Sequence, residues 1–590
     1  MALRVSLSLG LVLGASCVAS AVAGPIDPEV DSAMEQDPLL PSPAPVPVFP
    51  ERLKPLWIEA LAQPEADLKR LAAASIARAH RGGMPDLAGA IPHLAAELDR
   101  PDQDRIVRLA CAEALVVLDA RQAAAILRRH AASSLEIGQM VEPALAAWGD
   151  PPAGEMWLAR LGDPGVRHQS LLLAIDGLGA IRELRADTRL LDLALSSSAA
   201  ADVRLCAARA LSRIRESGLE GSAAPLLADK SPAGLTDRLV AASLLAGHRG
   251  PAAQALLNAL AVDDEPAVAA IALRRLLEID PDLVLPLVSD AIRRDDPHVR
   301  RLAAEALIAR ATAEHVALVG TLLDDVHPDV RRFVRGEMIR MAGDATLAGP
   351  VIEAATGQLT RPSWRGQEQA IFILVAQAHR PAIPLLVERM ESERSEVLVT
   401  AAWALRRLEA RDVLPEMLDR ATRVTAAYRP PDEDSESAPG LALEGMDRQL
   451  GQLFEAFGQM NYGRAEPLMR RYVPKTSNLP PQGRSRAIWA LGKLYAGRSD
   501  ERLAREFGER VADVASLSPE FPTVRYASAI SLGRMKAETE LPVLREFSGR
   551  YAGDKPGVAC LWAIEQITGE PMPPLEPVLL ANPSFLTPLE

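Results

Sequence analysis

The sequence predicts an all-α fold: an α-solenoid, or superhelix, of about fourteen stacked antiparallel helix pairs. Three observations lead to this prediction. Hydrophobic residues make up 48% of the chain and aromatic residues only 4%, so the core must consist largely of Ala and Leu, which favour helices. A nine-residue frame of apolar and small residues recurs with helical spacing. Copies of the frame often lie about 31 residues apart, which leaves room for two short helices and two turns.

The frame is clearest in the stretch DDPHVRRLAAEALIAR, residues 295–310. Its apolar stripe consists of Val299, Leu302, Ala303, Ala306 and Leu307. This spacing places all five side chains on one face of an amphipathic helix. Asp296 is expected to be the N-cap and Pro297 the first helical residue, because both residue types favour a helix start at these positions. His298 is expected to point away from the stripe into solvent.

The same frame can be laid on many other segments. Close copies begin at Val107, Val203, Val268, Val330, Val397 and Val524, and looser copies at Leu68, Ile137, Val166, Thr236, Gly366, Met446, Gly483 and Pro556. The residues between the frames form the expected partner helices, such as PAAQALLNALAV at residues 251–262. Helices of this length are marginal alone in water, so each pair must bury its stripe against its neighbours.

An aliphatic first helix, an Asp/Glu-Pro turn and a second helix of the form xVRxxAAxAL resemble a HEAT repeat. The short period resembles the HEAT subgroup named after phycobilisome lyases. The resemblance covers roughly residues 55–570. It implies a helical superhelix and a tendency to bind proteins, and it implies no reaction by itself.

The chain begins with MALRVSLSLGLVLGASCVASAVAG, which has the shape of a secretory signal peptide over residues 1–23, cleaved after Ala23. The mature protein is therefore expected to be exported, periplasmic or extracellular. Two alternatives would anchor it to the envelope. The apolar run could remain as an uncleaved signal, or Cys17 in LGASC could be lipidated.

Composition divides the rest of the chain. We expect a Pro-rich, extended and poorly ordered leader at 24–50, an N-terminal solenoid arm at 51–426, an acidic Pro/Ser-rich disordered insertion at 427–445, a C-terminal arm at 446–570 and a Pro-rich tail at 571–590. The tail cannot continue as helix and could lie over the last repeat as a cap. No strands are expected.

The formal net charge of −13 argues against nucleic-acid binding, whose affinity depends on neutralising phosphates. The same charge disfavours anionic membrane surfaces, so we expect contact with membranes only through the possible N-terminal anchor.

An arginine often follows the first residue of the frame, at Arg108, Arg167, Arg204, Arg300, Arg331 and Arg525. These cations could grip an acidic partner. We favour a structural ladder in which Arg108, Arg204, Arg300 and Arg331 bridge to aspartates of nearby turns, with Asp296 among the acids. Such pairs set the register of repeats more than they add stability. The other candidate acids are Asp104, Asp163, Asp202 and Asp329.

No catalytic, metal or cofactor site is predicted. The nine histidines are scattered, and the chain contains no HExxH or CxxC motif. Some HEAT-like enzymes, such as deoxyhypusine hydroxylase, bind iron through His-Glu dipeptides, which this chain lacks. Cys111, Cys206 and Cys560 are expected to be small buried thiols. Trp403, Trp489 and Trp562 are expected to pack in the core, with a ligand-stacking platform as the alternative.

Together these patterns predict an exported, non-catalytic HEAT-repeat scaffold that binds protein partners on its concave helical surface. One alternative is a HEAT-like enzyme or enzyme accessory of the lyase or oxidoreductase type. A second is an envelope-anchored structural protein. The sequence identifies neither the partner nor the oligomeric state.

Overall fold

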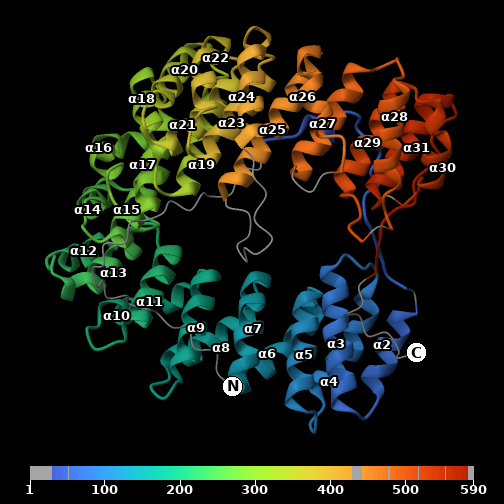
Figure 1. The fold of residues 1–590 in the computed structure, drawn as a ribbon. Coiled ribbons are helices and arrows are strands. Elements are labelled where there is room, and N and C mark those ends of the chain that lie inside the picture. Colours follow the sequence, from blue (N-terminus) through green and yellow to red (C-terminus); the bar gives the residue numbers. More distant parts are fainter. Residues whose placement is uncertain are drawn as a thin grey trace, which may run out of the picture. The chain divides into compact units, whose positions relative to one another are not determined.

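A computed structural model describes residues 29–50, 52–427, 441–475, 479–515, 517–551 and 553–581. It is built almost entirely of helices and confirms the predicted all-α solenoid (Figure 1). Within the described residues the helices form fifteen consecutive pairs, from α2–α3 to α30–α31, where about fourteen were expected. The second helix of each pair coincides with a predicted frame. We call these the frame helices and the others the partner helices.

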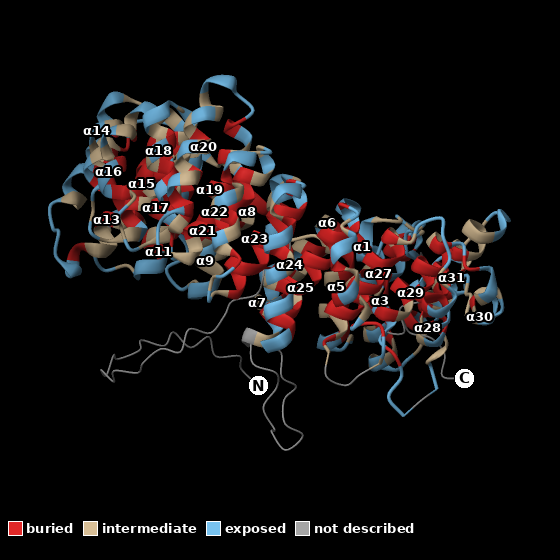
Figure 2. Ribbon diagram, turned by 45° about the horizontal axis from the view of Figure 1, so that its top comes forward, coloured by how far each residue is buried: buried red, intermediate tan, exposed pale blue. Residues whose placement is uncertain are grey.

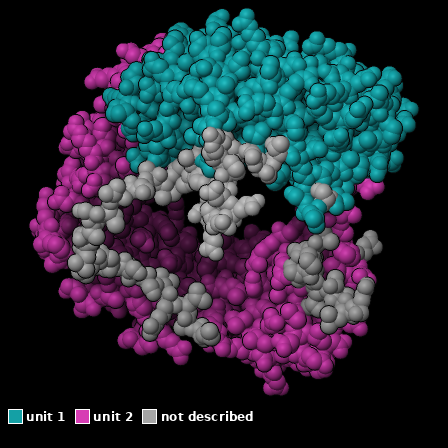
Figure 3. Space-filling model, in the orientation of Figure 1, with its two compact units in different colours: residues 1–40, 355–550, 554–574 teal, residues 41–354, 551–553, 575–590 magenta. Residues whose placement is uncertain are grey.

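The chain divides into two compact units (Figure 3). Unit 1 comprises residues 1–40, 355–550 and 554–574, and unit 2 comprises residues 41–354, 551–553 and 575–590. The sequence placed a division at 427–445 instead. The structure differs because the frame helices on either side of that segment, α23 and α25, pack directly on each other. Residues 428–440 lie outside the described residues, and helix resumes at Leu441.

Unit 2 holds the first frame helices: α3 Ala66–Arg81, α5 Arg105–Val117, α7 Leu135–Trp148, α9 His168–Ala180, α11 Ala201–Ile214, α13 Leu235–Leu245, α15 Pro266–Ile279, α17 Pro297–Ala309 and α19 Pro328–Met341. Its partner helices are α2 Leu53–Ala62, α4 Ile91–Asp99, α6 Ala124–Ser133, α8 Pro151–Gly162, α10 Asp187–Leu195, α12 Glu220–Ala223, α14 Pro251–Ala261, α16 Val288–Ala291 and α18 Ala313–Thr321. The boundary between the two units falls within the next partner helix, α20 Ala345–Leu359. Successive frame helices contact each other from α3 to α19, so each stripe is buried between neighbours (Figure 2).

Helix α17 shows how the sequence builds one repeat. Its stripe residues Leu302, Ala303, Ala306 and Leu307 are fully buried. The carboxylate of Asp296 accepts hydrogen bonds from the backbone N–H of His298 and of Val299, at 2.9 and 3.0 Å. This is the predicted N-cap, and the His298 side chain is exposed as expected.

A short parallel strand pair, which the sequence did not predict, lies in unit 2. Strand β1 Val46–Val48 pairs with β2 Leu579–Ala581, with Val46 opposite Leu579. A further parallel bridge joins Tyr551 to Glu576. The prolines of the leader and the tail exclude helix but allow extended chain, and these extended stretches satisfy each other's backbone groups.

Unit 1 contains α1 Ala33–Gln36 and the frame helices α21 Trp364–Ala376, α23 Ser395–Arg407, α25 Leu441–Gln459, α27 Pro481–Leu494, α29 Pro522–Met535 and α31 Lys555–Thr568. Its remaining partner helices are α22 Ile383–Arg389, α24 Leu414–Ala427, α26 Glu466–Arg470, α28 Glu501–Ala512 and α30 Leu541–Glu546. Short 3₁₀ turns lie between many helices of the chain. They are η1 Leu87–Ala90, η2 Arg121–Ala123, η3 Leu184–Ala186, η4 Ala224–Leu227, η5 Pro232–Gly234, η6 Pro281–Leu283, η7 Leu285–Leu287, η8 Leu322–Asp324, η9 Arg380–Ala382, η10 Arg411–Val413, η11 Gly463–Ala465 and η12 Glu538–Glu540.

Glycines let the last frame helices of unit 1 approach closely. A methyl group added at Gly492 of α27 would lie 2.7 Å from the Cα atom of Ser531, and one added at Gly533 of α29 would lie 2.8 Å from the Cα atom of Ala563. Both distances are too short for carbon atoms, so only glycine fits. The close packing holds these helices at a fixed spacing.

None of the described helices has both the length and the apolar character needed to cross a membrane. No group of three or more potential metal ligands occurs among the described residues. Cys111, Cys206 and Cys560 are buried free thiols, and burial raises the pKa of each to about 12. The predicted signal peptide, including Cys17, lies outside the described residues.

Candidate functional site

Residues 29–38, which we call the N-terminal segment, lie against the frame helices of unit 1. The sequence predicted an extended, poorly ordered leader here. In the structure the segment contains the single helical turn α1, and its Met34 side chain is only 2% exposed. Figure 1 shows the segment in dark blue crossing α27 and α29. The groups that receive it form what we call the polar row: Trp403, Arg406, Gln452, Glu455, Trp489, Lys493 and Arg534.

Asp31 provides the first anchor of the segment. Its Oδ1 accepts hydrogen bonds from Trp403 Nε1 and Arg406 Nη2, both at 2.6 Å. Its backbone carbonyl accepts from Arg406 at 2.8 Å and from Gln452 Nε2 at 2.9 Å, and Arg407 lies 3.5 Å from the carboxylate. Burial alone would raise the pKa of Asp31, but the Trp403 hydrogen bond and the arginine charges hold it below its usual value.

Glu455 of α25 binds the middle of the segment from a fully buried position. Its carboxylate accepts hydrogen bonds from the hydroxyl of Ser32 and from the backbone N–H of Ala33, the latter at 2.7 Å. Two guanidinium groups balance its charge: Arg406 at 3.5 Å and Arg486 at 3.1 Å. The carboxylate therefore caps the start of the turn α1 and pairs with two cations at once.

Asp37 provides the second anchor. Its backbone carbonyl accepts hydrogen bonds from Trp489 Nε1 at 2.7 Å and from Arg534 Nη2 at 2.6 Å. Its carboxylate lies 2.8 Å from Lys493 Nζ and 2.9 Å from Arg534. Burial would raise the pKa of Asp37, but the Lys493 hydrogen bond and the Arg534 charge hold it below its usual value.

The polar row follows the repeat. Trp403, Gln452 and Trp489 are each the seventh residue of their frame, and cations follow both tryptophans three or four residues later, in WALRR at 403–407 and WALGK at 489–493. One helical turn separates these positions, so they share a face. The sequence predicted that both tryptophans pack in the core. They are buried, but each indole N–H binds the N-terminal segment. The recurring Trp-Ala-Leu with a following cation was the signal that could have identified the row.

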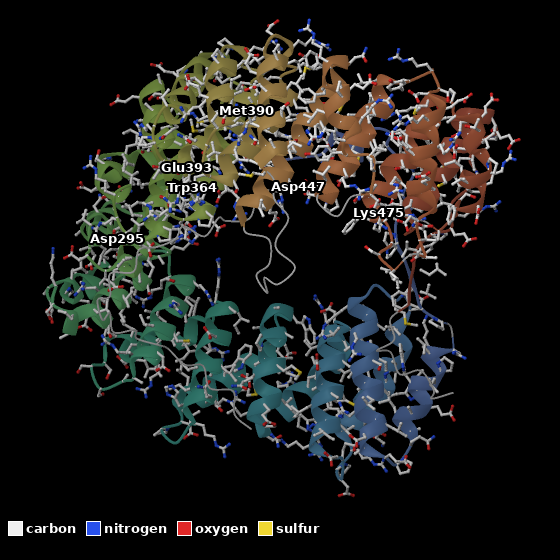
Figure 4. All side chains as sticks on the ribbon, in the orientation of Figure 1. Asp295, Trp364, Met390, Glu393, Asp447 and Lys475 are labelled. Carbon is white, nitrogen blue, oxygen red and sulfur yellow. The ribbon has the colours of Figure 1, made fainter. Side chains whose placement is uncertain are left out.

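Two buried carboxylates fix the helices that carry the row. Asp447 of α25, labelled in Figure 4, accepts a hydrogen bond from the backbone N–H of Gly483 at 2.7 Å, and burial raises its pKa to about 6. Glu520, in the turn before α29, accepts two hydrogen bonds from Arg484 of α27, at 2.8 and 2.6 Å. These contacts join α25, α27 and α29 near their N-terminal ends.

Polar contacts dominate the binding of the segment. The only apolar side chains of the segment that become buried are Ala33 and Met34, and burying a methionine contributes about 1.5–3 kcal/mol. The row recognises two backbone carbonyls and two backbone N–H groups, which any peptide offers, and two carboxylates, which give selectivity. The arrangement can therefore bind a short acidic peptide that forms a helical turn between its two carboxylates.

Of the predicted ladder, Arg300 forms the most complete contact. Its Nε and Nη2 donate to both carboxylate oxygens of Asp325, at 2.6 and 2.7 Å, and both side chains are buried. Its Nη1 donates to the backbone carbonyls of Arg294 and Asp295 at 2.7 Å each (Asp295 is labelled in Figure 4). Asp296, predicted as an acid of the ladder, caps α17 instead, because its position directs its oxygens to the helix N–H groups.

The other three arginines differ in their acceptors. Arg204 pairs with Asp237 at 2.5 Å and also donates to a backbone carbonyl. Arg331 donates to the backbone carbonyls of Asp325 and Val326, at 2.7 and 3.1 Å. Arg108 donates to the carbonyls of Arg100 and Pro101, at 3.2 and 2.6 Å. The shared role of all four arginines is to bind backbone carbonyls, and the acids of Arg204 and Arg300 come from the following repeat.

Replacing Arg300 by lysine should lower the free energy of unfolding by about 2 kcal/mol, because an ammonium group cannot keep the paired hydrogen bonds to Asp325. The same change at Arg108 should cost less than about 1 kcal/mol, since that side chain binds two exposed carbonyls. Urea unfolding of the two variants measures the difference. Equal losses would mean that the buried pair adds no more to stability than the exposed contacts of Arg108 do.

The comparisons with known proteins agree with the repeat architecture. A family model for HEAT repeats matches residues 253–339, which run from α14 to α19. No curated protein matches the chain. Among solved structures, Kap95p in complex with RanGDP is 12% identical, with 88% of this chain and 72% of that chain covered and a TM-score of 0.50. At this identity the similarity shows the fold alone.

Two further structures are similar. Yeast importin-β (Kap95p) is 11% identical, with 88% of this chain and 73% of that chain covered and a TM-score of 0.48. Kap121p bound to RanGTP is 12% identical, with 88% of this chain covered and a TM-score of 0.47, and the chain spans 57% of its length.

Proposed function

We propose that the protein is an exported, non-catalytic HEAT-repeat scaffold that binds protein partners through its frame helices. One observation carries the proposal: the frame helices of unit 1 hold a short acidic segment through its backbone and its carboxylates. A surface that can hold this segment has the groups needed to hold a peptide of another protein.

The structural similarity to Kap95p supports the same role by analogy. Kap95p forms a complex with RanGDP, so a helical superhelix of this kind can bind a protein. The short repeat period further supports a place in the phycobilisome-lyase-like subgroup. The net charge of −13 favours protein over nucleic-acid partners.

Export rests on the signal-like residues 1–23. The mass of the protein from the envelope and extracellular fractions tests it, and we expect a chain that begins at Gly24. A chain that retains residues 1–23 would support the uncleaved anchor, and a lipidated Cys17 would support the second anchored form.

Metal analysis and an absorption spectrum of the same sample test the enzyme alternative, because a stoichiometric metal or pigment would overturn the non-catalytic proposal.

Site-specific photo-cross-linking in the native compartment tests partner binding. A photoreactive residue replaces either Arg407 of α23, exposed beside the polar row, or Asp419 of the partner helix α24, whose side chain is 70% exposed. We expect one defined protein adduct, identified by mass spectrometry, from position 407 and none from position 419. Equal labelling at both positions, or none at either, would contradict recognition through the frame helices.

A further inference from the structure

We propose that the polar row is the binding site for a short acidic peptide of a partner protein, and that the N-terminal segment occupies it as a tethered competitor. The inference rests on the proposed function and names the partner's chemistry: two carboxylates six residues apart, with small residues after the first. In this chain the motif reads DSAMEQD, residues 31–37.

The spacing of the two carboxylates follows from the helices. Asp31 reaches Trp403 and Arg406 on α23, while Asp37 reaches Lys493 of α27 and Arg534 of α29. The two anchors are therefore on different repeats, and a peptide must cross α25 to use both. At each anchor the row also binds the peptide's backbone carbonyl. A peptide with a carboxylate at only one end would contact only one of the two anchors.

The middle of the polar row restricts which residues can lie between the two acidic residues of a bound peptide. Glu455 accepts a backbone N–H and a hydroxyl there, and the residue at the Ala33 position is buried. A large side chain at that position would meet α25, and an acidic one would meet Glu455. The position after it accepts an apolar side chain, as Met34 shows. These contacts select small residues and then an apolar one.

Charge favours an acidic occupant over a basic one. Arg406, Arg407, Lys493 and Arg534 surround the two aspartates, and the carboxylate of Glu455 is already balanced by Arg406 and Arg486. This cluster of cations stands out in a chain whose formal net charge is −13. A basic peptide would leave these cations unpaired and would be repelled.

A partner peptide of the same chemistry can replace each contact that the N-terminal segment makes with the polar row. The carboxylates of Asp31 and Asp37 are 23% and 48% exposed, so water already reaches both anchors. The segment has a single helical turn and buries two apolar side chains. Its advantage is the covalent tether, which provides an effective concentration on the order of millimolar. A partner peptide with the same contacts must overcome this concentration.

The test uses the full chain and a fluorescein-labelled peptide of residues 29–38, EVDSAMEQDP, as the probe. Fluorescence anisotropy measures its affinity for the wild type, for Asp31→Ala/Asp37→Ala, and for the control Asp67→Ala/Asp102→Ala, which changes two exposed aspartates of unit 2. We expect the first variant to bind the probe at least tenfold more tightly than the wild type, and the control to bind like the wild type. A probe with Asn at both aspartate positions should bind at least tenfold more weakly.

A further substitution tests whether the probe binds at the polar row. Lys493→Glu, added to the Asp31→Ala/Asp37→Ala variant, reverses one partly exposed charge of the row and should lower probe affinity at least tenfold. Circular dichroism confirms that both variants remain helical. If the folded double variant does not bind the probe, the segment is a structural brace and the inference fails. If light scattering shows a wild-type dimer that the double variant dissociates, the occupant is a second copy, and the inference also fails.

The two proposals fail in different ways. Loss of probe binding with cross-linking from position 407 intact would overturn the acidic peptide and leave the scaffold function standing. Probe binding without any cross-linked protein would count against the scaffold function. When an adduct forms, its cross-linked peptide must contain two acidic residues six positions apart, and an adduct without them would overturn the inference.

Discussion

Replacing Glu455 by alanine should lower the free energy of unfolding of unit 1 by about 3–5 kcal/mol. The carboxylate is fully buried and lies between the guanidinium groups of Arg406 and Arg486. Its removal leaves two neighbouring cations without their shared acid and leaves the N–H of Ala33 without its acceptor. The N-terminal segment should detach from α25 as a result.

Glu444→Ala is the matched control on the same helix. The Glu444 side chain is 50% exposed and pairs with Arg448 one turn away, so its loss should cost less than about 1 kcal/mol. Urea unfolding followed by tryptophan fluorescence measures both variants, since Trp403 and Trp489 report on the row. A similar cost for the two changes would show that Glu455 does not organise this part of unit 1.

Replacing Leu302 by aspartate should destabilise unit 2 by more than about 4 kcal/mol. Leu302 is fully buried in the stripe of α17, and an aspartate there would be a buried charge without a partner. The exposed neighbour His298 lies on the same helix, and His298→Ala should change stability by less than about 0.5 kcal/mol.

Thermal melting of the two variants compares them directly. Leu302→Asp should lower the midpoint by several degrees, and His298→Ala should leave it unchanged. Equal shifts would mean that the stripe does not face the neighbouring repeats.

The sequence predicted the repeats well because a helical repeat is a local feature. The stripe of Val299 to Leu307 repeats every three or four residues, and Asp296 and Pro297 mark the start within the same turn. Each frame needs only its two neighbours to bury it, so the order of the repeats in space follows their order in the chain.

The segment that the polar row binds could not be predicted in this way because its contacts join residues that are far apart in the chain. Asp31 binds Trp403 at a separation of 372 residues, and Asp37 binds Arg534 at 497. The leader shows no helical period, so composition alone indicated an unstructured segment. The acid partner of Arg300 was missed for a similar reason, because Asp325 belongs to the next repeat, 25 residues away.

The same distance along the chain has a consequence for biosynthesis. The N-terminal segment is translated first, but the helices that receive it follow 372 to 497 residues later. At about 5–20 residues per second, the interval is about 20–100 s. Each neighbouring pair of repeats can form as it emerges, whereas the N-terminal segment can complete its contacts only after α29 has been made. The N-terminal segment, which is among the first parts of the described chain to be made, is therefore among the last to form its contacts.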